Sequence, residues 1–170
     1  QEAGWNDRIF LTAAVRGDDN SAFGSDFDAA IYPKFSGTWV VSEEDFWNVG
    51  WLNSLRLRTA WGQSGRQPET FDAVTLFSPA TGPGGSAAVR PATLGNPDIG
   101  PEVSSELELG FDAAFLDDRI SSEFTYYYQT TEDALTSLPL SPTNGFPGNL
   151  AANLGQLDTW GYEVALSARA

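Results

Sequence analysis

Regular alternation of apolar and polar side chains over residues 106–129 is the feature that most restricts how this chain can fold. In ELELGFDAAF, apolar residues occupy every second position, and ISSEFTYYYQ resumes the pattern after a short break. Successive side chains of a strand point to opposite faces, so a period of two indicates β-strands and not a helix. We therefore predict two long antiparallel strands joined by a two-residue turn at Asp117 and Asp118.

Four further segments alternate in the same way and are also predicted to be strands. They span about residues 5–18, 31–42, 54–64 and 154–169. In all six predicted strands, the positions that define the apolar face carry no charged side chain, whereas the opposite face carries both acidic and basic residues. The sequence therefore predicts an all-β protein with one uncharged face.

Composition excludes several classes of function. The sequence contains neither cysteine nor histidine, which excludes thiolate nucleophiles, the common zinc sites and a Ser-His-Asp triad. The formal net charge of −14 argues against nucleic-acid binding, because that function needs a basic surface to neutralise phosphates. We expect no enzymatic activity, no cofactor and no nucleic-acid partner.

Strand length and connection length favour a membrane barrel. A soluble β-sandwich also has one uncharged face, but its strands usually run about 5–6 residues, and strands of about ten tilted residues can cross a bilayer. Long connections at about 19–30, 65–101 and 131–153 alternate with short ones, as in barrels with short periplasmic turns and long outer loops. We predict an antiparallel, up-and-down transmembrane β-barrel segment of about six long strands. The alternative is a soluble all-β carbohydrate-binding or adhesion module.

In such a barrel the uncharged face would contact lipid and the charged face would line the lumen. The predicted lipid-facing residues are Leu55, Leu57, Trp61, Leu107, Leu109, Phe111, Phe115, Phe124, Tyr126, Tyr162, Val164 and Leu166. The predicted lumen-facing residues are Arg56, Arg58, Glu106, Glu108, Asp112, Glu123 and Glu163. For the two arginines, we favour ion pairs with acidic residues of the wall or of a plug over direct binding of an anionic substrate. A glycosidase-like role for Glu106 and Glu108 is possible on spacing alone, but polar lining of a lumen is the preferred interpretation.

The long connections hold the remaining candidates for binding. Phe71, Phe77 and Phe146 are aromatic residues that could stack on sugar rings or cover a ligand. The oxygen-rich stretch with Asp18, Asp19, Asp26 and Asp28 is a weak calcium candidate. Its spacing matches no EF-hand, so a solvated acidic loop is the preferred interpretation. The Gly-rich GPGGS at 82–86 lacks the context of a phosphate loop and is expected to be flexible.

An ordered set of motifs makes the sequence more specific than alternation does. YPKFSGTWVVSEEDFW (32–47) and LNSLRLRTAWGQSGRQ (52–67) precede a long run from LGNPDIGPE to TTEDAL (94–135). LPLSPTNGF (138–146) and NLGQLDTWGYEVALSA (153–168) follow. In this order the motifs resemble the barrel of TonB-dependent outer-membrane receptors, most of all the SusC/RagA-like branch.

The resemblance implies a function that alternation alone does not give. It implies import of a bulky nutrient, an oligosaccharide or a peptide, across the bacterial outer membrane, energised through TonB. It also implies a SusD-like surface lipoprotein as partner, outer-membrane lipid around the wall, and contact with TonB through a plug. We expect residues 1–170 to be part of one β-barrel domain whose plug and remaining strands lie outside this sequence.

Overall fold

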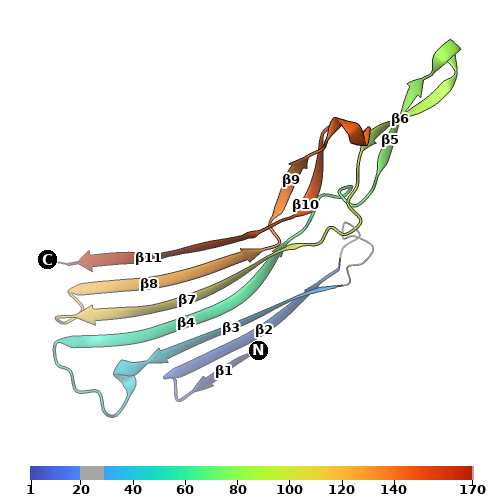
Figure 1. Ribbon diagram of the computed structural model, residues 1–170. Coiled ribbons are helices and arrows are strands. Elements are labelled where there is room, and N and C mark those ends of the chain that lie inside the picture. Colours follow the sequence, from blue (N-terminus) through green and yellow to red (C-terminus); the bar gives the residue numbers. More distant parts are fainter. Residues whose placement is uncertain (20–28, 170) are drawn as a thin grey trace.

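The computed structural model describes residues 1–19 and 29–169, and these form an antiparallel β-structure (Figure 1). In this described part the main sheet has seven strands, and their order across the sheet follows their order along the chain. The strands are β1 (Glu2–Trp5), β2 (Ile9–Asp18), β3 (Ala30–Val40), β4 (Leu52–Arg66), β7 (Glu102–Phe115), β8 (Ile120–Glu132) and β11 (Gln156–Ala168). Each strand is antiparallel to its neighbours, as in the wall of an up-and-down barrel.

The predicted all-β antiparallel architecture is confirmed, and its six long strands are β2, β3, β4, β7, β8 and β11. Their registers keep the two faces separate across the sheet. Leu57 of β4 lies opposite Phe111 of β7, and Phe111 lies opposite Phe124 of β8. Val164 of β11 continues this apolar row. A slip of one residue at any pairing would move a whole strand's apolar side chains to the charged face.

The predicted first strand, residues 5–18, is wrong at its beginning. The chain forms the short strand β1 first, turns, and enters β2 only at Ile9. Asn6 and Asp7 adopt φ angles of 50° and 53°. Asn and Asp tolerate this left-handed region better than most residues do. Residues 6–8 therefore connect β1 and β2 into a hairpin. Apolar and polar residues continue to alternate through this tight turn, so the sequence pattern predicted a single strand.

The predicted two-residue turn at Asp117 and Asp118 is also wrong. Phe115 pairs with Ile120, which leaves a four-residue connection at 116–119. Leu116, Asp117 and Asp118 have φ angles of 54°, 56° and 61°. A residue of the neighbouring strand β4 holds this connection in place. The backbone N–H of Asp117 donates to Asn53 Oδ1 at 2.9 Å. That contact between segments is not visible in local sequence.

The predicted strand at 31–42 ends earlier than expected. β3 ends at Val40, and Val41–Glu43 forms the 3-10 turn η1. Val41, the first residue of this turn, is buried. Val41 continues the alternating pattern of the strand in the sequence, but in the structure it is part of the turn.

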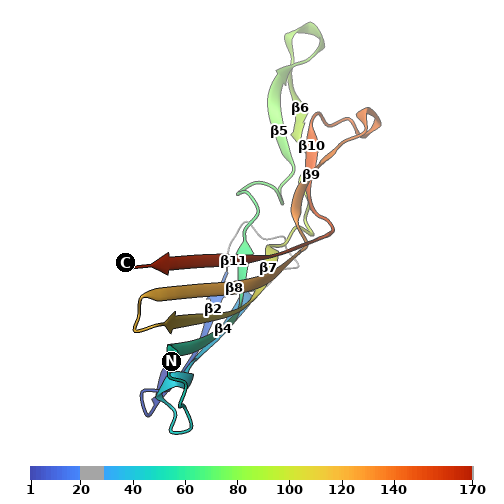
Figure 2. The same cartoon turned by 90° about the vertical axis from the view of Figure 1, so that its left-hand side faces the viewer.

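Both of the longest predicted loops contain hairpins instead of irregular chain. Residues 65–101 contain β5 (Leu76–Thr81) and β6 (Ala87–Thr93), with the 3-10 turn η2 (Pro83–Gly85) at their tip. Residues 131–153 contain β9 (Leu135–Pro139) and β10 (Asn149–Asn153), with η3 (Pro142–Asn144) between them. The GPGGS stretch thus forms the tip of a hairpin, and its flexibility stays a prediction. Figure 2 shows both hairpins beyond the same end of the main sheet.

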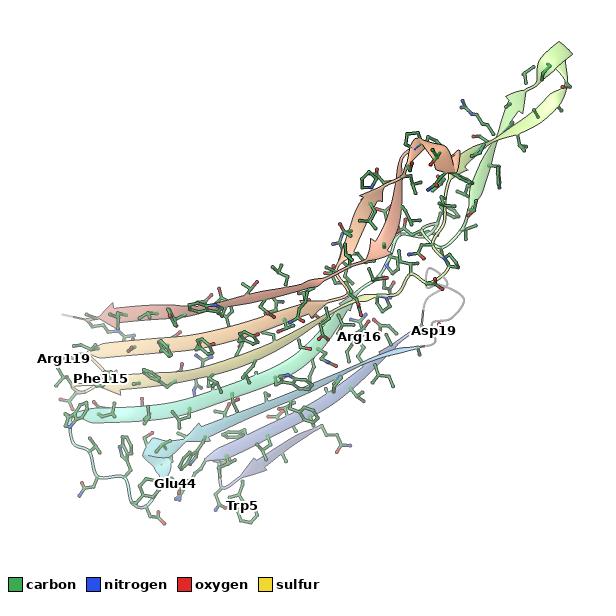
Figure 3. The ribbon with its side chains drawn as sticks, in the orientation of Figure 1. Trp5, Arg16, Asp19, Glu44, Phe115 and Arg119 are labelled. Atoms are coloured by element: carbon green, nitrogen blue, oxygen red, sulfur yellow. The ribbon has the colours of Figure 1, made fainter. Side chains whose placement is uncertain are left out.

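The two connections that contain hairpins lie at one end of the sheet, and the shorter connections at 6–8, 41–51 and 116–119 lie at the other. Figure 3 places Trp5, Glu44, Phe115 and Arg119 at the end with the short connections, and Arg16 and Asp19 at the end with the hairpins. We call these the turn end and the hairpin end. Connection lengths predicted this asymmetry correctly for the two hairpin-bearing connections, whereas the connection at 41–51 is as long as the one at 19–29.

The described residues do not enclose a hydrophobic core. Both views show the main sheet as a single layer (Figures 1 and 2). The buried hydrophobic residues in the described ranges are scattered: Ala30, Tyr32, Val41, Ile99 and Ala113. A soluble domain of similar length normally buries most of its large apolar side chains. None of the short helices in this described part is long and apolar enough to cross a membrane.

Candidate functional site

The charged face of the main sheet carries a cluster of three ionic side chains. Arg56 and Arg58 lie two positions apart on the same face of β4. The neighbouring strand β7 contributes Asp112. Arg56 Nε donates to Asp112 Oδ2 at 2.7 Å, and Arg58 Nη2 lies 2.9 Å from Asp112 Oδ1. Both carboxylate oxygens are therefore engaged by guanidinium groups. The predicted pairing of these arginines with acidic residues of the wall is found here.

Gly110 makes room for this cluster. It lies directly opposite Arg58, and a Cβ at this position would be 2.7 Å from the Phe124 carbonyl oxygen. The same Cβ would lie 3.4 Å from Arg58 Nη2. With no side chain in the way, Arg58 reaches over β7 and donates to Thr125 Oγ1 on β8 at 3.4 Å. The glycine thus lets one arginine link three strands on the charged face.

A groove lies on the same face, nearer the hairpin end. Its volume is about 400 Å³, and its lining includes Lys34, Glu106, Glu108 and Gln129. Glu106 and Glu108 lie opposite Gly62 and Ala60, small residues that leave space above β4. In the described ranges neither glutamate forms a salt bridge, in contrast to Asp112. The groove therefore presents two glutamates that form no salt bridge, the cationic Lys34 and neutral polar groups such as Gln129.

The other two predicted lumen residues lie on the same face but outside the arginine cluster. Glu123 pairs in register with Asp112, and Glu163 pairs with Thr125. All seven residues of the predicted lumen set thus share one face of the sheet. Their contact with a lumen stays a prediction.

The predicted lipid-facing residues share the opposite, apolar face. They form continuous rows across the strands, such as Leu57, Phe111, Phe124 and Val164. Many remain exposed, including Leu109 at 45% and Val164 at 64% of their full accessible area. Aromatic rings contact one another along this face, with ring centroids of Phe111 and Phe124 5.5 Å apart. The face is continuous and uncovered in the described structure, and its contact with lipid stays a prediction.

A row of polar residues limits the apolar face at the hairpin end. Two positions beyond Trp61, Leu107, Tyr128 and Trp160, the strands place Gln63, Ser105, Thr130 and Asp158 side by side. Gln63 Nε2 donates to Ser105 Oγ at 3.0 Å, and Thr130 Oγ1 donates to Asp158 Oδ1 at 2.9 Å. The apolar face therefore ends in a hydrogen-bonded polar row, immediately above a row rich in tryptophan and tyrosine.

An ionic clamp at the turn end was not predicted. Arg8 Nη1 donates to Glu44 Oε2 at 3.2 Å, and Arg8 Nη2 donates to Asp45 Oδ1 at 3.2 Å. Trp39 Nε1 donates to the other oxygen of Glu44 at 2.9 Å. Desolvation works to lower the Arg8 pKa, but hydrogen bonds and attraction from the two carboxylates outweigh it and raise that pKa. The acidic run SEED was the only sequence signal for this clamp.

The predicted outer-loop residues are only partly brought together. Phe77 of β5 and Phe146 of the connection after η3 meet with ring centroids 5.9 Å apart. Phe71 is exposed in the segment before β5, and no ring contact joins it to that pair among the residues described. All three lie beyond the hairpin end of the sheet. Their contact with a ligand stays a prediction.

The calcium candidates do not form a site within the described structure. Asp18 instead pairs with Arg16, whose Nε lies 2.6 Å from Asp18 Oδ1. Asp26 and Asp28 lie outside the described residues. Over 1–19 and 29–169, no group of three or more Asp or Glu is placed to hold a metal ion. Calcium binding stays a prediction.

Comparison with known proteins assigns the architecture to a family. The family model described as "TonB dependent receptor-like, beta-barrel" matches residues 2–169. This chain belongs to the TonB-dependent receptor-like β-barrel family. The resemblance inferred from the sequence motifs is confirmed, and the family is one of receptors and transporters.

Its relatives include members of the SusC/RagA-like branch. TonB-dependent receptor P39 of Formosa agariphila is 29% identical over 167 residues, which cover 97% of this chain and 16% of the relative. TonB-dependent receptor SusC of Bacteroides thetaiotaomicron is 28% identical over 172 residues, covering 95% of this chain and 17% of SusC. The solved structure of the RagAB peptide transporter matches with a TM-score of 0.87 and 25% identity. That match covers 98% of this chain and 19% of the solved one.

This chain therefore spans about a sixth of the length of the curated receptors it matches. In this family the described sheet is a section of barrel wall, which explains why it is open at both edges and has no core of its own. Sequence reasoning missed the pairing of Arg8 with Glu44, and it missed two asparagines at the hairpin end, Asn96 and Asn153, whose side chains bond to the backbone of Ala151 and Gly100. Their contacts join segments far apart in the sequence, which alternation does not report.

Proposed function

We propose that this chain forms part of the wall and outer loops of an outer-membrane receptor. That receptor imports a bulky nutrient, an oligosaccharide or a peptide, with energy supplied through TonB. The observation that carries the proposal is an uncharged face that is continuous over the main sheet and has no covering layer in the described structure. Family membership supports the same function.

The dimensions of the apolar face support a place in the membrane. From Leu107 to Phe115 on β7 the face extends roughly 27 Å along the strand, at about 3.4 Å per residue. At a strand tilt near 40° this corresponds to about 21 Å of height, close to the apolar band of about 25 Å on outer-membrane barrels. The tryptophan and tyrosine row beneath the polar row is the pattern expected at a membrane-water interface. In water, so large an apolar surface would drive aggregation.

The charged face supports the role of lumen lining. The cluster of Arg56, Arg58 and Asp112 compensates part of its charge within the wall itself. The groove with Glu106 and Glu108 leaves polar groups free to interact with whatever occupies the lumen. A wall of this kind would bind and guide cargo.

Partners and cargo are proposed from the relatives. SusC is named as a TonB-dependent receptor, and the RagAB structure is named as a peptide transporter. We propose contact with TonB through a plug outside this chain, a SusD-like surface lipoprotein over the hairpins, and a glycan or peptide as substrate. Phe71, Phe77 and Phe146 are the proposed ligand contacts in the outer loops.

The alternative of a soluble carbohydrate-binding or adhesion module lacks support. It would need a second layer of the same folded chain over Leu109, Phe124 and Val164. Such a layer is absent from the described part of the chain, and Val164 is 64% exposed. The family match leads to the same conclusion.

A deletion of the complete receptor gene in its host tests the proposal. The deletion strain is expected to lose growth on either oligosaccharides or peptides too large for porins, and to keep growth on the matching monosaccharides or amino acids. Loss of TonB should reproduce the defect, and the receptor should be found in the outer-membrane fraction. Normal growth on every oligomeric glycan and peptide, or recovery of the receptor in the soluble fraction, would contradict the proposal.

A further inference from the structure

The two long connections at the hairpin end are joined to each other by side-chain hydrogen bonds. One connection carries hairpin β5–β6 and the other carries hairpin β9–β10. About 50 residues of sequence separate them at their points of contact, as in the pair Gly100 and Asn153. The contacts gather at the base of both hairpins, where the chain enters β7 and β11 (Figure 1).

Asn153, the last residue of β10, makes three side-chain hydrogen bonds, two of which reach the other connection. Its Oδ1 accepts the Gly100 backbone N–H at 2.8 Å, and its Nδ2 donates to the Gly100 carbonyl oxygen at 2.9 Å. The same Nδ2 donates to the Asp133 carbonyl oxygen at 2.9 Å. Both donor hydrogens of the amide and one acceptor position are thus used. Gly100 is buried, so loss of this side chain would leave buried backbone groups without partners.

Asn96 makes the complementary contact from the other connection. Its Nδ2 donates to the Ala151 carbonyl oxygen of β10 at 3.0 Å, and its Oδ1 accepts the Asp98 backbone N–H at 3.1 Å. Its backbone N–H donates to the Asp72 carbonyl oxygen at 2.8 Å. One residue thus connects the start of the β5–β6 segment, its end, and hairpin β9–β10. We call Asn96 and Asn153, with their backbone partners, the asparagine clasp.

The surroundings of the clasp are close-packed. Ile99 lies in the sequence between Asn96 and Gly100, the partner of Asn153. Its side chain is 0% exposed, although the main sheet has no hydrophobic core. A Cβ on the neighbouring Gly95 would lie 2.3 Å from the backbone of Val74, so the chain is in direct contact with itself there. Glu102 Oε2 accepts the Leu135 backbone N–H at 2.9 Å and adds a further link from β7 to β9.

A second contact joins the hairpins farther from the sheet. Phe77 of β5 meets Phe146 of the other connection with ring centroids 5.9 Å apart. A two-stranded hairpin alone is only marginally stable in water. Two hairpins that share a hydrogen-bonded base and an aromatic contact restrain each other, because neither can swing without breaking contacts to the other.

We propose that the asparagine clasp locks hairpins β5–β6 and β9–β10 into one rigid outer arm, so that they move together relative to the main sheet. A ligand or partner that displaces one hairpin then also displaces the other. The displacement is transmitted to the first residues of β7 and β11, which follow the two hairpins in the chain. The clasp asparagines act as positioning residues, because they fix Phe77 and Phe146 without contacting a ligand themselves. This inference concerns mechanics at the hairpin end, so it can fail while the proposed import function holds.

Electron-spin distance measurements on the complete receptor in vesicles test the proposal. One label is placed near the tip of each hairpin, with Ala87→Cys and Asn144→Cys, in a background cleared of other cysteines. Both sites are exposed and neither side chain is in the clasp. The unchanged clasp is expected to give a single narrow tip-to-tip distance distribution. Asn153→Ala with Asn96→Ala is expected to broaden it by about twofold or more, because the shared base loses its connecting hydrogen bonds.

Asn149→Ala is the matched control. Asn149 lies in the same strand β10, is exposed, and forms no side-chain hydrogen bond within the described residues. It should leave the distribution narrow. Heat-dependent gel migration of each variant reports whether the barrel itself remains folded. A broad distribution with the clasp intact, or one that stays narrow in a folded double variant, would overturn the proposal.

Discussion

Arg58 Nη2 lies 2.9 Å from Asp112 Oδ1, although the residue directly opposite Arg58 in β7 is Gly110. The missing side chain of Gly110 lets the guanidinium lie diagonally across the strand, where it shares Asp112 with Arg56. The charge of this carboxylate is therefore compensated twice, while other acids of the charged face are left without a cation in the described structure.

A double-mutant cycle measures the pairing of Arg58 with Asp112. We expect Arg58→Ala and Asp112→Ala together to cost less than the sum of the two single changes, with a coupling of about 0.5–1 kcal/mol. The measurement is urea unfolding of the receptor in phospholipid vesicles. Arg58→Ala with Glu106→Ala is the control, because Glu106 forms no salt bridge in the described ranges and lies four positions from Gly110 along β7, so this pair should be additive. Additivity for Asp112 as well would show that the pairing contributes nothing to stability.

Neighbouring substitutions on β11 distinguish the two faces. Val164 and Ala165 are adjacent and both exposed in the described structure, but they point to opposite faces. Arginine at a lipid-facing position near the bilayer midplane costs about 2–4 kcal/mol. We expect Val164→Arg to lower the free energy of unfolding in vesicles by that amount and Ala165→Arg to change it little. Equal effects of the two changes would mean that the apolar face is not in contact with lipid.

Close packing of Tyr32 against Gly65 leaves no room for a side chain at this position of β4. Tyr32 is 2% exposed, and a Cβ on Gly65 would lie 2.2 Å from its Cζ atom. We expect Gly65→Ala to destabilise the receptor by about 1–3 kcal/mol through overpacking. Gly17→Ala, where a Cβ meets nothing within 4 Å, should be close to neutral. Unfolding midpoints of the two variants give the comparison.

The same steric cause predicts a rescue. In a Tyr32→Ala background the space beside Gly65 is open, so Gly65→Ala should then cost much less than in the natural background. An unchanged cost would indicate that the glycine is needed for a reason other than the tyrosine ring.

The clamp at the turn end should depend on Glu44 and hardly on Asp45. The Glu44 side chain is 21% exposed and accepts from both Arg8 and Trp39, whereas the Asp45 side chain is 95% exposed. We expect Glu44→Ala to cost about 1–2 kcal/mol, since two partners lose a charged acceptor. Asp45→Ala should cost no more than a few tenths. Trp39 fluorescence should change only in the Glu44 variant; the reverse order of the two effects would contradict this account.

The strands and the two faces could be predicted because they depend on local sequence. Alternation at Leu107, Leu109 and Phe111 fixes which side chains share a face, whatever strand lies beside them. The same local signal misled where the chain turned within an alternating stretch, at Asn6 and at Leu116. When residues other than glycine adopt a positive φ, the alternation of apolar and polar side chains does not show where the strand ends.

The amino-acid sequence by itself determined that this protein is antiparallel β-structure with one uncharged face, and its motifs determined the receptor family. Only the tertiary structure decided that Asp112 receives both arginines, that the longest loops contain hairpins, and that Asn153 holds Gly100. The physical reason is distance along the chain. Side-chain direction is set residue by residue, whereas a hydrogen bond across about 50 residues depends on the register of every strand between its partners.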